Sequence, residues 1–406
     1  DLQYLDEVII SAGKFSKKRS QNGRVVDVIT HEEILRSGSR DIGQLLHGRT
    51  GLFVNGANSA PSKDRGIYMR GAGPQYSLIM IDGIPLYDPA GVNGVFDLRM
   101  LSLGNIERIE ILKGSQSTLY GTDAMAGVIN IITREGEEGL HPNAALSFGS
   151  YAQAVADVGI TGKQGKVSYS AGYRFWHSSE ISEARAPKGS GFDEDPFLQH
   201  AFNASASIAL TSGISFSPFI QFSSMAGEYD AGAFTDAPDN KYEARNYRYG
   251  FNMQSAGKNP WQVQLAHNRL DRKFQSEFGD LNSVGSLWHG EVFYTHHIAE
   301  QWRALGGIMF QQQEITSESI SDARILAPYL SLFYAPMPGI HLEGGLRLNH
   351  HSEFGNELTI SVNPSWQLNK SWKIYANYTT GFKAPTLSQL YGQFGPNPNL
   401  RPETSR

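Results

Sequence analysis

The chain has 406 residues, 35 Lys and Arg against 40 Asp and Glu, and no cysteine. Charged residues make up 18% of the chain, below the usual figure of about 25%, whereas glycine and aromatic residues are abundant. The sequence lacks thiols for disulfides or metal sites, an apolar run of about 18 residues that would predict a membrane-spanning helix, and a basic stripe that would predict nucleic acid binding. This composition favours an all-β protein.

The first third of the chain mixes helix and strand patterns. Residues 24–30 predict a strand that ends at Thr30, and Thr30 with Glu33 forms a capping box for a helix over residues 31–46. Short strands are then expected at 67–70, 78–81, 106–112 and 128–133. These elements predict a compact α+β domain over residues 21–136.

From about residue 143 to residue 406, apolar and polar residues alternate with a period of two. In residues 202–210, the apolar side chains fall on even positions and Asn203 and Ser205 fall between them. About thirteen such segments occur, each of about 9 to 12 residues, which is the length that a tilted strand needs to cross a bilayer. Strands of soluble sandwiches are shorter, about five or six residues. We therefore expect a transmembrane β-barrel over residues 143–406.

Connection lengths and aromatic residues agree with this expectation. Short links alternate with longer loops, as in outer-membrane barrels, and the loops are expected at 177–200, 225–245, 271–285, 314–323 and after Phe382. Residues expected to lie at strand ends, as in the aromatic girdles of such barrels, are Trp176, Trp261, Trp302, Trp366, Trp372 and Phe382. A bacterial barrel needs an even number of strands, so closing strands are expected beyond residue 406. A soluble barrel or propeller is the alternative.

Four stretches resemble the signature motifs of the TonB-dependent outer-membrane receptors. The segment at 6–12 is similar to the TonB box, residues 67–71 and 79–85 resemble motifs of the plug domain, and residues 106–134 resemble the closing signature of the plug. The TonB-box residues are Asp6, Glu7, Val8, Ile9, Ile10, Ser11 and Ala12, and the matching plug residues are Arg70, Gly71, Asp82, Gly83, Lys113, Gly114, Tyr120 and Gly121.

This resemblance implies a plug domain inside the lumen of a barrel of the 22-stranded type, of which about nine strands would be missing. It also implies residence in the outer membrane of a Gram-negative bacterium. A TonB box and linker are expected at 1–20, ahead of the plug. The absence of an apolar leader at Asp1 predicts that a signal peptide is absent or already removed. The basic residues that follow the TonB box, Lys14, Lys17, Lys18 and Arg19, are expected to form a solvated face.

The resemblance is nearest to the cobalamin receptors. It rests on residues 86–94, which resemble an apex of the plug in that group, and on residues 381–392 and 397–403. Residues expected to bind ligand are Asn55, Asn58, Tyr87, Ala90, Gly91, Val92 and Asn93. Cobalamin is the favoured ligand, with a ferric siderophore or haem as the alternatives. Haem receptors place a histidine between the last two motifs, and this sequence has none from 384 to 399.

Two of the predicted long loops are acidic. Their carboxylates are Asp193, Glu194, Asp195, Asp230, Asp236 and Asp239. Calcium takes six to eight oxygen ligands, so acids from neighbouring loops could form a calcium site, and the cobalamin receptors order these loops with calcium. Solvated loop acids are the alternative interpretation. No other cofactor is expected.

The predicted function is energised import of a scarce nutrient. The resemblance implies that residues 6–12 bind the inner-membrane protein TonB, which draws on its proton-driven motor complex, as an added strand. Other expected partners are outer-membrane lipid, the ligand, and a surface lipoprotein or a periplasmic binding protein, but no nucleic acid. No motif of nucleophile, base or phosphate loop is present, so no catalytic residue is assigned. A passive porin or a surface β-protein is the rival class.

Overall fold

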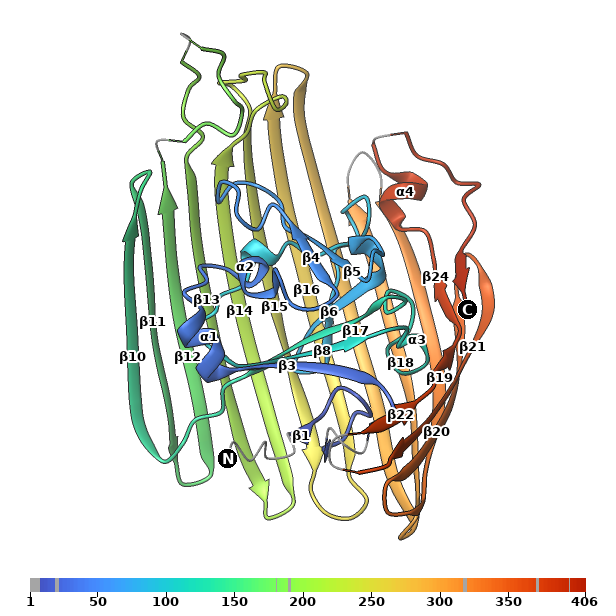
Figure 1. The fold of residues 1–406 in the computed structure, drawn as a ribbon. Helices are drawn as coiled ribbons and strands as arrows, with labels where there is room; N and C mark the ends of the chain where they lie inside the picture. The colour runs from blue at the N-terminus through green and yellow to red at the C-terminus, as the bar shows by residue number, and fades with distance from the viewer. Residues whose placement is uncertain are drawn as a thin grey trace.

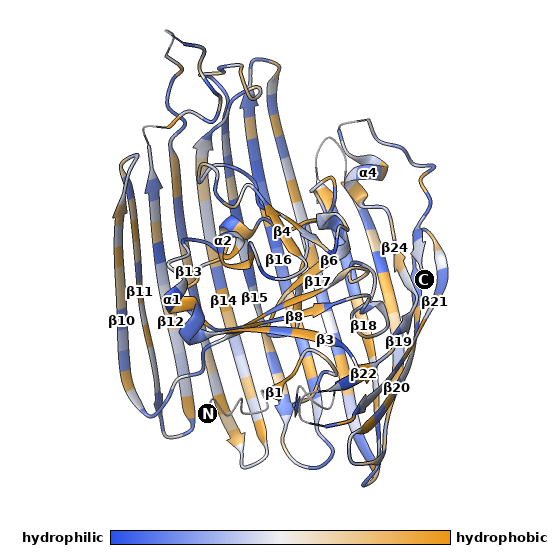
Figure 2. Cartoon of the chain, viewed as in Figure 1, coloured by the Kyte–Doolittle hydropathy of each residue, from blue (hydrophilic) through white to orange (hydrophobic). Residues whose placement is uncertain are grey.

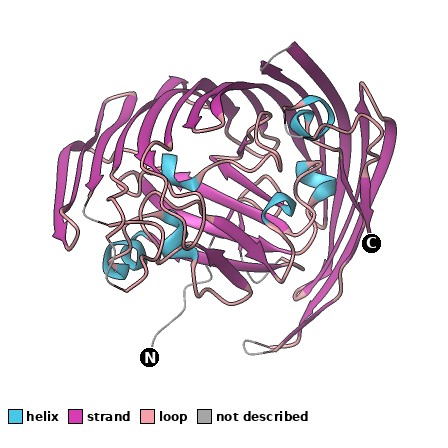
Figure 3. Ribbon diagram, turned by 90° about the horizontal axis from the view of Figure 1, so that it is seen from above, coloured by secondary structure: helices cyan, strands magenta, loops and turns pink. Residues whose placement is uncertain are grey.

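The computed structural model has two parts, an N-terminal domain and a large sheet that curves around it (Figures 1 and 3). The N-terminal domain ends with the strand that finishes at Thr133. None of the helices in the described part of the chain has both the length and the apolar character that a membrane crossing requires. The structure describes residues 8–18, 22–179, 181–188, 191–316, 320–369, 372–393 and 395–406.

A five-stranded sheet forms the centre of the N-terminal domain. Its strand order is β3-β8-β9-β6-β7, and only β6 and β9 run parallel. These strands are β3 (Val25–Thr30), β6 (Ser77–Ile81), β7 (Ile84–Leu86), β8 (Ile106–Lys113) and β9 (Gly127–Thr133). A separate hairpin and the short helices complete the domain: β4 (Leu52–Asn55), β5 (Gly66–Met69), α1 (His31–Ser37), α2 (Ile42–Leu46), α3 (Ser117–Tyr120), η2 (Pro74–Tyr76) and η3 (Leu98–Met100).

The single helix expected over residues 31–46 is wrong, although its start is confirmed. The capping box of Thr30 and Glu33 begins α1, but Gly38 adopts a left-handed conformation with φ of 63° and ends the helix. Asp41 then caps a second helix, because its carboxylate accepts a hydrogen bond of 2.8 Å from the Gln44 amide. The break lets α2 turn its apolar side towards the sheet.

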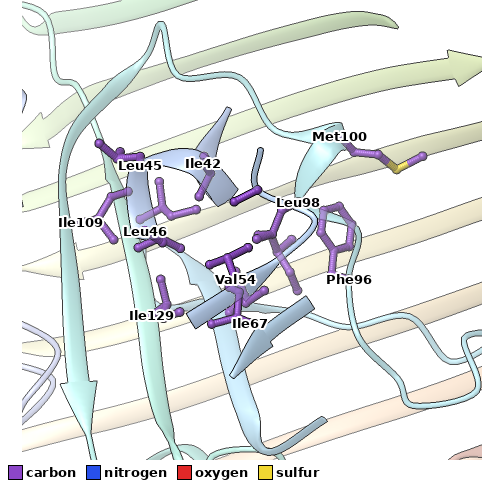
Figure 4. Close-up of a cluster of buried hydrophobic side chains, with 14 of the residues drawn as sticks. Ile42, Leu45, Leu46, Val54, Ile67, Phe96, Leu98, Met100, Ile109 and Ile129 are labelled. Atoms are coloured by element: carbon purple, nitrogen blue, oxygen red, sulfur yellow. The ribbon is translucent and has the colours of Figure 1, made fainter. Parts of the chain in front are cut away.

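Apolar side chains from the helices, the hairpin and the sheet form one core (Figure 4). Ile42 and Leu46 of α2 are fully buried, as is Ile109 of β8. Val54 and Ile67 come from the β4–β5 hairpin and lie in the same cluster. The cluster continues into the large sheet through Trp176, Phe197 and Leu270, so the core packs the domain against the wall, and the loops near residues 60 and 90 project from it.

The large sheet contains 14 strands, close to the number expected. β10 to β22 follow one another in chain order with antiparallel pairing, and β23 pairs with β21. The first strand begins at Gly139, a few residues before the expected start at 143. The strands are β10 (Gly139–Gly149), β11 (Gln153–Gln164), β12 (Val167–Ser178), β13 (Phe197–Thr211), β14 (Ile214–Glu228), β15 (Lys241–Ser255), β16 (Trp261–Ser276), β17 (Gly279–Ala299), β18 (Trp302–Thr316), β19 (Ile320–Met337), β20 (Ile340–His351), β21 (Gly355–Gln367), β22 (Lys373–Tyr375) and β23 (Tyr378–Thr379). Beyond it, β24 (Gly381–Lys383) pairs with β25 (Glu403–Ser405), and α4 (Leu387–Tyr391) lies between them.

Hydrophilic and hydrophobic residues alternate along the strands of this sheet (Figure 2), and the period of two places them on opposite faces. On β17, Trp288 and Val292 are exposed on the outer face, whereas His289 and Glu291 are buried on the inner face. β13 follows the same rule, with Phe202 exposed. The outer face is therefore apolar where water would favour polar groups, which matches a lipid-facing wall.

Some loops and aromatic positions of the expected barrel are wrong. Residues 271–285 and 314–323 are not long loops, because β16 and β17 pair as far as Ser276 and Gly279, and β18 and β19 pair as far as Thr316 and Ile320. Trp176 does not lie in a girdle: it is 1% exposed and packs on Phe197 with ring centroids 5.2 Å apart. Phe382 is also buried. The exposed tryptophans at the opposite end of the strands, Trp302, Trp366 and Trp372, do fit a girdle.

Replacing Ala206 by arginine tests the assigned facing. Phe202, on the even-numbered face of β13, is exposed, whereas Ala201, on the same face as Ser205, is buried. Ala206→Arg should destabilise the folded receptor by about 2 to 4 kcal/mol if the residue lies near the bilayer midplane, and Ser205→Arg should cost much less. Folding of the two variants in liposomes under urea measures the difference. Equal stabilities would contradict the facing.

Candidate ligand-binding site

A cavity of about 570 Å³ lies between the N-terminal domain and the sheet, at the end where the long loops lie (Figure 1). We call it the upper cavity. Loops 62–66 and 90–99 of the N-terminal domain form one side, and strands β14 to β18 form the other. Residues near α4 close part of the rim. The volume suits a ligand larger than a simple ion.

The loop around residue 90 is held against both neighbours. The Asp88 carboxylate is fully buried, accepts a hydrogen bond of 3.1 Å from the Ala90 amide, and pairs with Arg272 of β16. Thr386 donates its hydroxyl hydrogen to the Val92 carbonyl oxygen at 2.9 Å. Gly94 has φ of 69°, and a Cβ there would lie 2.3 Å from the Tyr87 ring. The sequence therefore fixes this loop tightly before any ligand arrives.

Aromatic rings form the facing wall of the upper cavity. Tyr229, Tyr242 and Phe274 have ring centroids 6.3 to 6.4 Å apart, and all three line the cavity. The Arg99 guanidinium lies 5.4 Å from the centre of the Tyr242 ring. Although burial raises the pKa of the Asp97 carboxyl, the charge of Arg99 holds it below its usual value. The wall thus combines flat apolar surface with ionised, paired groups.

Part of the ligand set predicted from the sequence lines this cavity. Ala90, Gly91, Val92 and Asn93 do so. Tyr87 is 7% exposed and points into the domain. Asn55 lies at a separate hollow beside Arg70 and Gly71, and Asn58 lines none of the described cavities. Sequence reasoning missed Arg99, Tyr242 and Phe274, because nothing in their local pattern separates them from ordinary inward residues.

Three of the acidic loop residues come together. Oxygen atoms of Asp193, Asp230 and Asp236 lie within 4.8 Å of one another. The hydrogen bond with Asp236 raises the pKa of the Asp193 carboxyl to about 6, and burial raises that of Asp195 to about 7. Glu194, Asp195 and Asp239 are not part of the group. The structure thus brings half of the predicted set to one point near the rim of the upper cavity.

The N-terminal segment is packed against the N-terminal domain at the other end of the lumen. β1 (Val8–Ile9) pairs with β2 (Lys17–Lys18), and Ile9 and Ala12 are fully buried. The Glu110 carboxylate accepts hydrogen bonds of 3.0 and 2.8 Å from the amides of Ile10 and Ser11. Asp6 and Glu7 lie outside the described residues.

The expectation that the basic residues after this segment form a solvated face is wrong for two of them. Lys14 pairs with Glu291 of β17, and both side chains are buried. Lys17 lies 3.4 Å from Glu343 of β20, and burial lowers the pKa of Lys17 to about 8. Lys18 is exposed, as expected, and Arg19 lies outside the described residues. The segment is therefore anchored to the large sheet as well as to the N-terminal domain.

The motif residues of the N-terminal domain make turns and contacts with the sheet. Asp82 and Gly83 join β6 to β7 with φ of 52° and 80°, as a two-residue hairpin turn requires. Gly121 has φ of 88°, and a Cβ there would lie 2.9 Å from an Arg347 nitrogen. Arg347 is itself fully buried on β20. Glycine at position 121 therefore lets the Arg347 guanidinium of the large sheet lie against the N-terminal domain.

Two family models match the chain. The TonB-dependent receptor plug domain matches residues 18–128, and the TonB-dependent receptor-like β-barrel matches residues 197–406. The chain belongs to the TonB-dependent receptor family. Its N-terminal domain is the plug, its large sheet is the barrel wall, and the family consists of outer-membrane receptors and transporters rather than enzymes.

Solved structures agree with this fold. A ferric enterobactin receptor (PfeA) mutant from Pseudomonas aeruginosa is 22% identical, with a TM-score of 0.74, over 90% of this chain and 63% of that one. The siderophore receptors PirA from Acinetobacter baumannii and Pseudomonas aeruginosa are 18% and 21% identical, each with a TM-score of 0.72. The similarity extends over 90% and 93% of this chain, and over 62% and 69% of the two PirA chains. The chain thus spans about two thirds of the receptors that it resembles.

Removing the ammonium of Lys14 should loosen the N-terminal segment. Lys14→Met leaves the buried Glu291 carboxylate without its partner, a loss that costs about 3 to 5 kcal/mol in buried pairs. Backbone amides of Ile10 and Ser11 should then exchange hydrogen faster with solvent. Lys18→Met is the matched control, because exposed substitutions change stability by about 0.5 kcal/mol or less. Unchanged protection in the Lys14 variant would show that the ion pair does not hold the segment.

Proposed function

We propose that the protein imports an iron chelate across the outer membrane with energy supplied through TonB. The observation that carries this proposal is the position of two sites at opposite ends of one lumen. The upper cavity lies among the long loops, and the N-terminal segment is packed at the other end (Figure 1). A passive porin has no use for a plug that occupies the lumen, so the plug argues against that rival class.

A siderophore is the favoured ligand class. The similar structures are named as receptors of ferric enterobactin and of siderophores. This supports the alternative ligand from the sequence over cobalamin, which no comparison supports. A corrinoid remains the second candidate, because the residues that resemble the cobalamin receptors, Ala90 to Asn93, line the upper cavity.

We propose that residues 6–12 act as the TonB box. In the structure Ile9 is buried and the amides of Ile10 and Ser11 are bonded to Glu110. A segment in this state cannot add as a strand to a partner, because its backbone donors are already used. Engagement of TonB therefore requires that the segment leave Glu110, and ligand binding would favour that release.

A calcium site is proposed at Asp193, Asp230 and Asp236. The two loops that supply them are the loops that flank the upper cavity. Their carboxylates repel one another, and a divalent cation would relieve that repulsion and tie the loops together. The role would be to order the rim over bound ligand.

Ile9→Pro should abolish uptake and leave ligand binding intact. Proline removes a backbone donor from the strand that the segment must form with TonB. Uptake of radiolabelled ferric chelate into whole cells and binding of the same chelate to energy-depleted cells are the two measurements. Transport at the normal rate in the proline variant would contradict the coupling role.

Val92→Trp should block the upper cavity. Val92 lines the cavity and is 55% exposed, so the larger side chain has room to enter the cavity instead of the plug core. Affinity for the ligand should fall about tenfold or more. Leu35→Trp is the control, because Leu35 is 70% exposed on α1 and lies outside the cavity. Equal affinity of both variants for the ligand would show that the ligand binds outside the upper cavity.

Calcium should bind with a dissociation constant of about 0.1 to 1 mM, as in other extracellular modules. Asp236→Asn should weaken this binding at least about tenfold, whereas Asp239→Asn, outside the group, should not. Calorimetric titration measures both affinities. Chelation of calcium should also speed ligand dissociation, because ordered loops cover the ligand. Identical titrations for the two variants would exclude the site.

A further inference from the structure

Cations and carboxylates are equal in number in the lining of the upper cavity. The cations are Lys63, Arg65, Arg99 and Arg272, and the carboxylates are Asp64, Asp97, Glu183 and Asp230. An anion-binding cavity is instead expected to present an excess of cationic groups. The composition alone therefore favours a ligand without net charge.

Each of these cations already has a carboxylate partner. Lys63 lies 2.5 Å from Glu183, and Arg99 lies 2.6 Å from both Asp64 and Asp97. Arg65, with its side chain 1% exposed, lies 3.3 Å from Asp41. No cation that lines the cavity in the described ranges is left to receive an anionic ligand.

The ion pair of the fourth cation, Arg272, places a carboxylate behind the residues that line the upper cavity. Arg272 pairs with Asp88, which is fully buried and, like Asp41, does not itself line the cavity. Carboxylates therefore outnumber cations once the partners are counted. A polyanionic chelate would have to compete with carboxylates that already hold these cations, and the pairs of Arg65 with Asp41 and of Arg272 with Asp88 are largely buried. Flat aromatic rings, in contrast, stabilise an uncharged ligand by contact alone.

A second cavity supports the same conclusion independently. It has a volume of about 580 Å³ and lies between the plug and strands β12 to β17, beside the N-terminal segment. We call it the lower cavity. Its barrel wall is mainly hydroxyl and amide: Ser168, Ser170, Ser205, Ser207, Ser217, Asn252, Gln254, Gln262 and Gln264. A cargo leaving the upper cavity would meet hydrogen-bonding groups there.

The lower cavity also lacks an excess of cations. Its cations are Lys14, Arg108, Arg134 and Arg248, and its carboxylates are Asp82, Glu107, Glu135, Glu137 and Glu291. Lys14 pairs with Glu291, Arg134 lies 3.8 Å from Glu107, and Arg248 donates to the Gln221 side chain at 2.9 Å. Both cavities thus present hydrogen-bonding or aromatic surface without an excess of cations.

We propose that the cargo of this receptor is a chelate without net charge. Among iron chelates this selects a neutral ferric trihydroxamate, in which the three ligand charges balance the iron, over a trianionic ferric triscatecholate. The proposal rests on the proposed function, since it names the ligand class of the same site. It also leaves the neutral corrinoid as a ligand that the cavity can accept.

Equilibrium binding to the receptor in outer-membrane vesicles tests the proposal, with three probes: a neutral ferric trihydroxamate, a ferric triscatecholate and cyanocobalamin. The neutral ferric probe should bind at least about tenfold tighter than the trianionic one. Tighter binding of the triscatecholate would overturn the charge assignment and leave the import of iron chelates standing. Binding of cyanocobalamin alone would support the neutral class and overturn the iron assignment. Binding of none of the probes would overturn both.

A pair of variants separates charge from shape. Glu183→Gln frees the ammonium of Lys63 in the upper cavity, so affinity for the triscatecholate should rise about threefold to tenfold while affinity for the trihydroxamate stays. Glu228→Gln is the control, because Glu228 pairs with Lys241 at 2.9 Å and lines neither cavity. If Glu183→Gln leaves the ratio of the two affinities unchanged, ion pairing does not select the cargo and the proposal fails.

Discussion

The polar inner face of the barrel wall is the constraint on which the rest of the structure depends. Lipid contact makes the outer face apolar, and the alternation of strand side chains then directs polar and charged groups inward. Glu291, Glu343 and Arg347 are buried there, so each must find a partner on the plug or on the wall. The plug supplies such partners, among them Lys14 and Arg24. Charge pairing thus joins the two parts together with apolar packing, since Phe293, Leu305 and Tyr329 of the wall share a buried cluster with plug residues.

This mode of attachment has consequences at both ends of the lumen. Near the N-terminus, the same ion pairs that hold the plug also hold the segment that would meet TonB. Among the long loops, the pair of Asp88 and Arg272 fixes the loop around residue 90. The paired charges leave an upper cavity with an aromatic wall and no excess of cations. A pull on the N-terminal segment would have to break the hydrogen bonds of Ile10 and Ser11 to Glu110 and the pair of Lys14 with Glu291. The proposed coupling and the proposed choice of cargo therefore both rest on how charges are satisfied inside the wall.

The sequence predicts the architecture well, because period-two alternation and the turn motifs are local signals. A few neighbouring residues are enough to predict the outward facing of Phe202, the Asp82–Gly83 turn and the Thr30 capping box. The errors arise where partners distant in sequence decide. Lys14 looks solvated until Glu291, 277 positions away, is placed beside it. Trp176 resembles a girdle residue but packs inward on Phe197, and Tyr242 and Phe274 meet only when β15 and β16 pair.

Energy dependence of uptake tests the central claim most directly. Cells that carry the receptor are given a radiolabelled neutral ferric chelate with and without an uncoupler that collapses the proton-motive force. An energised importer with a plug fixed by buried ion pairs should still bind the chelate at the surface but stop accumulating it once the uncoupler is added. Accumulation that continues at the same rate without the proton-motive force would contradict the account and indicate a passive pore.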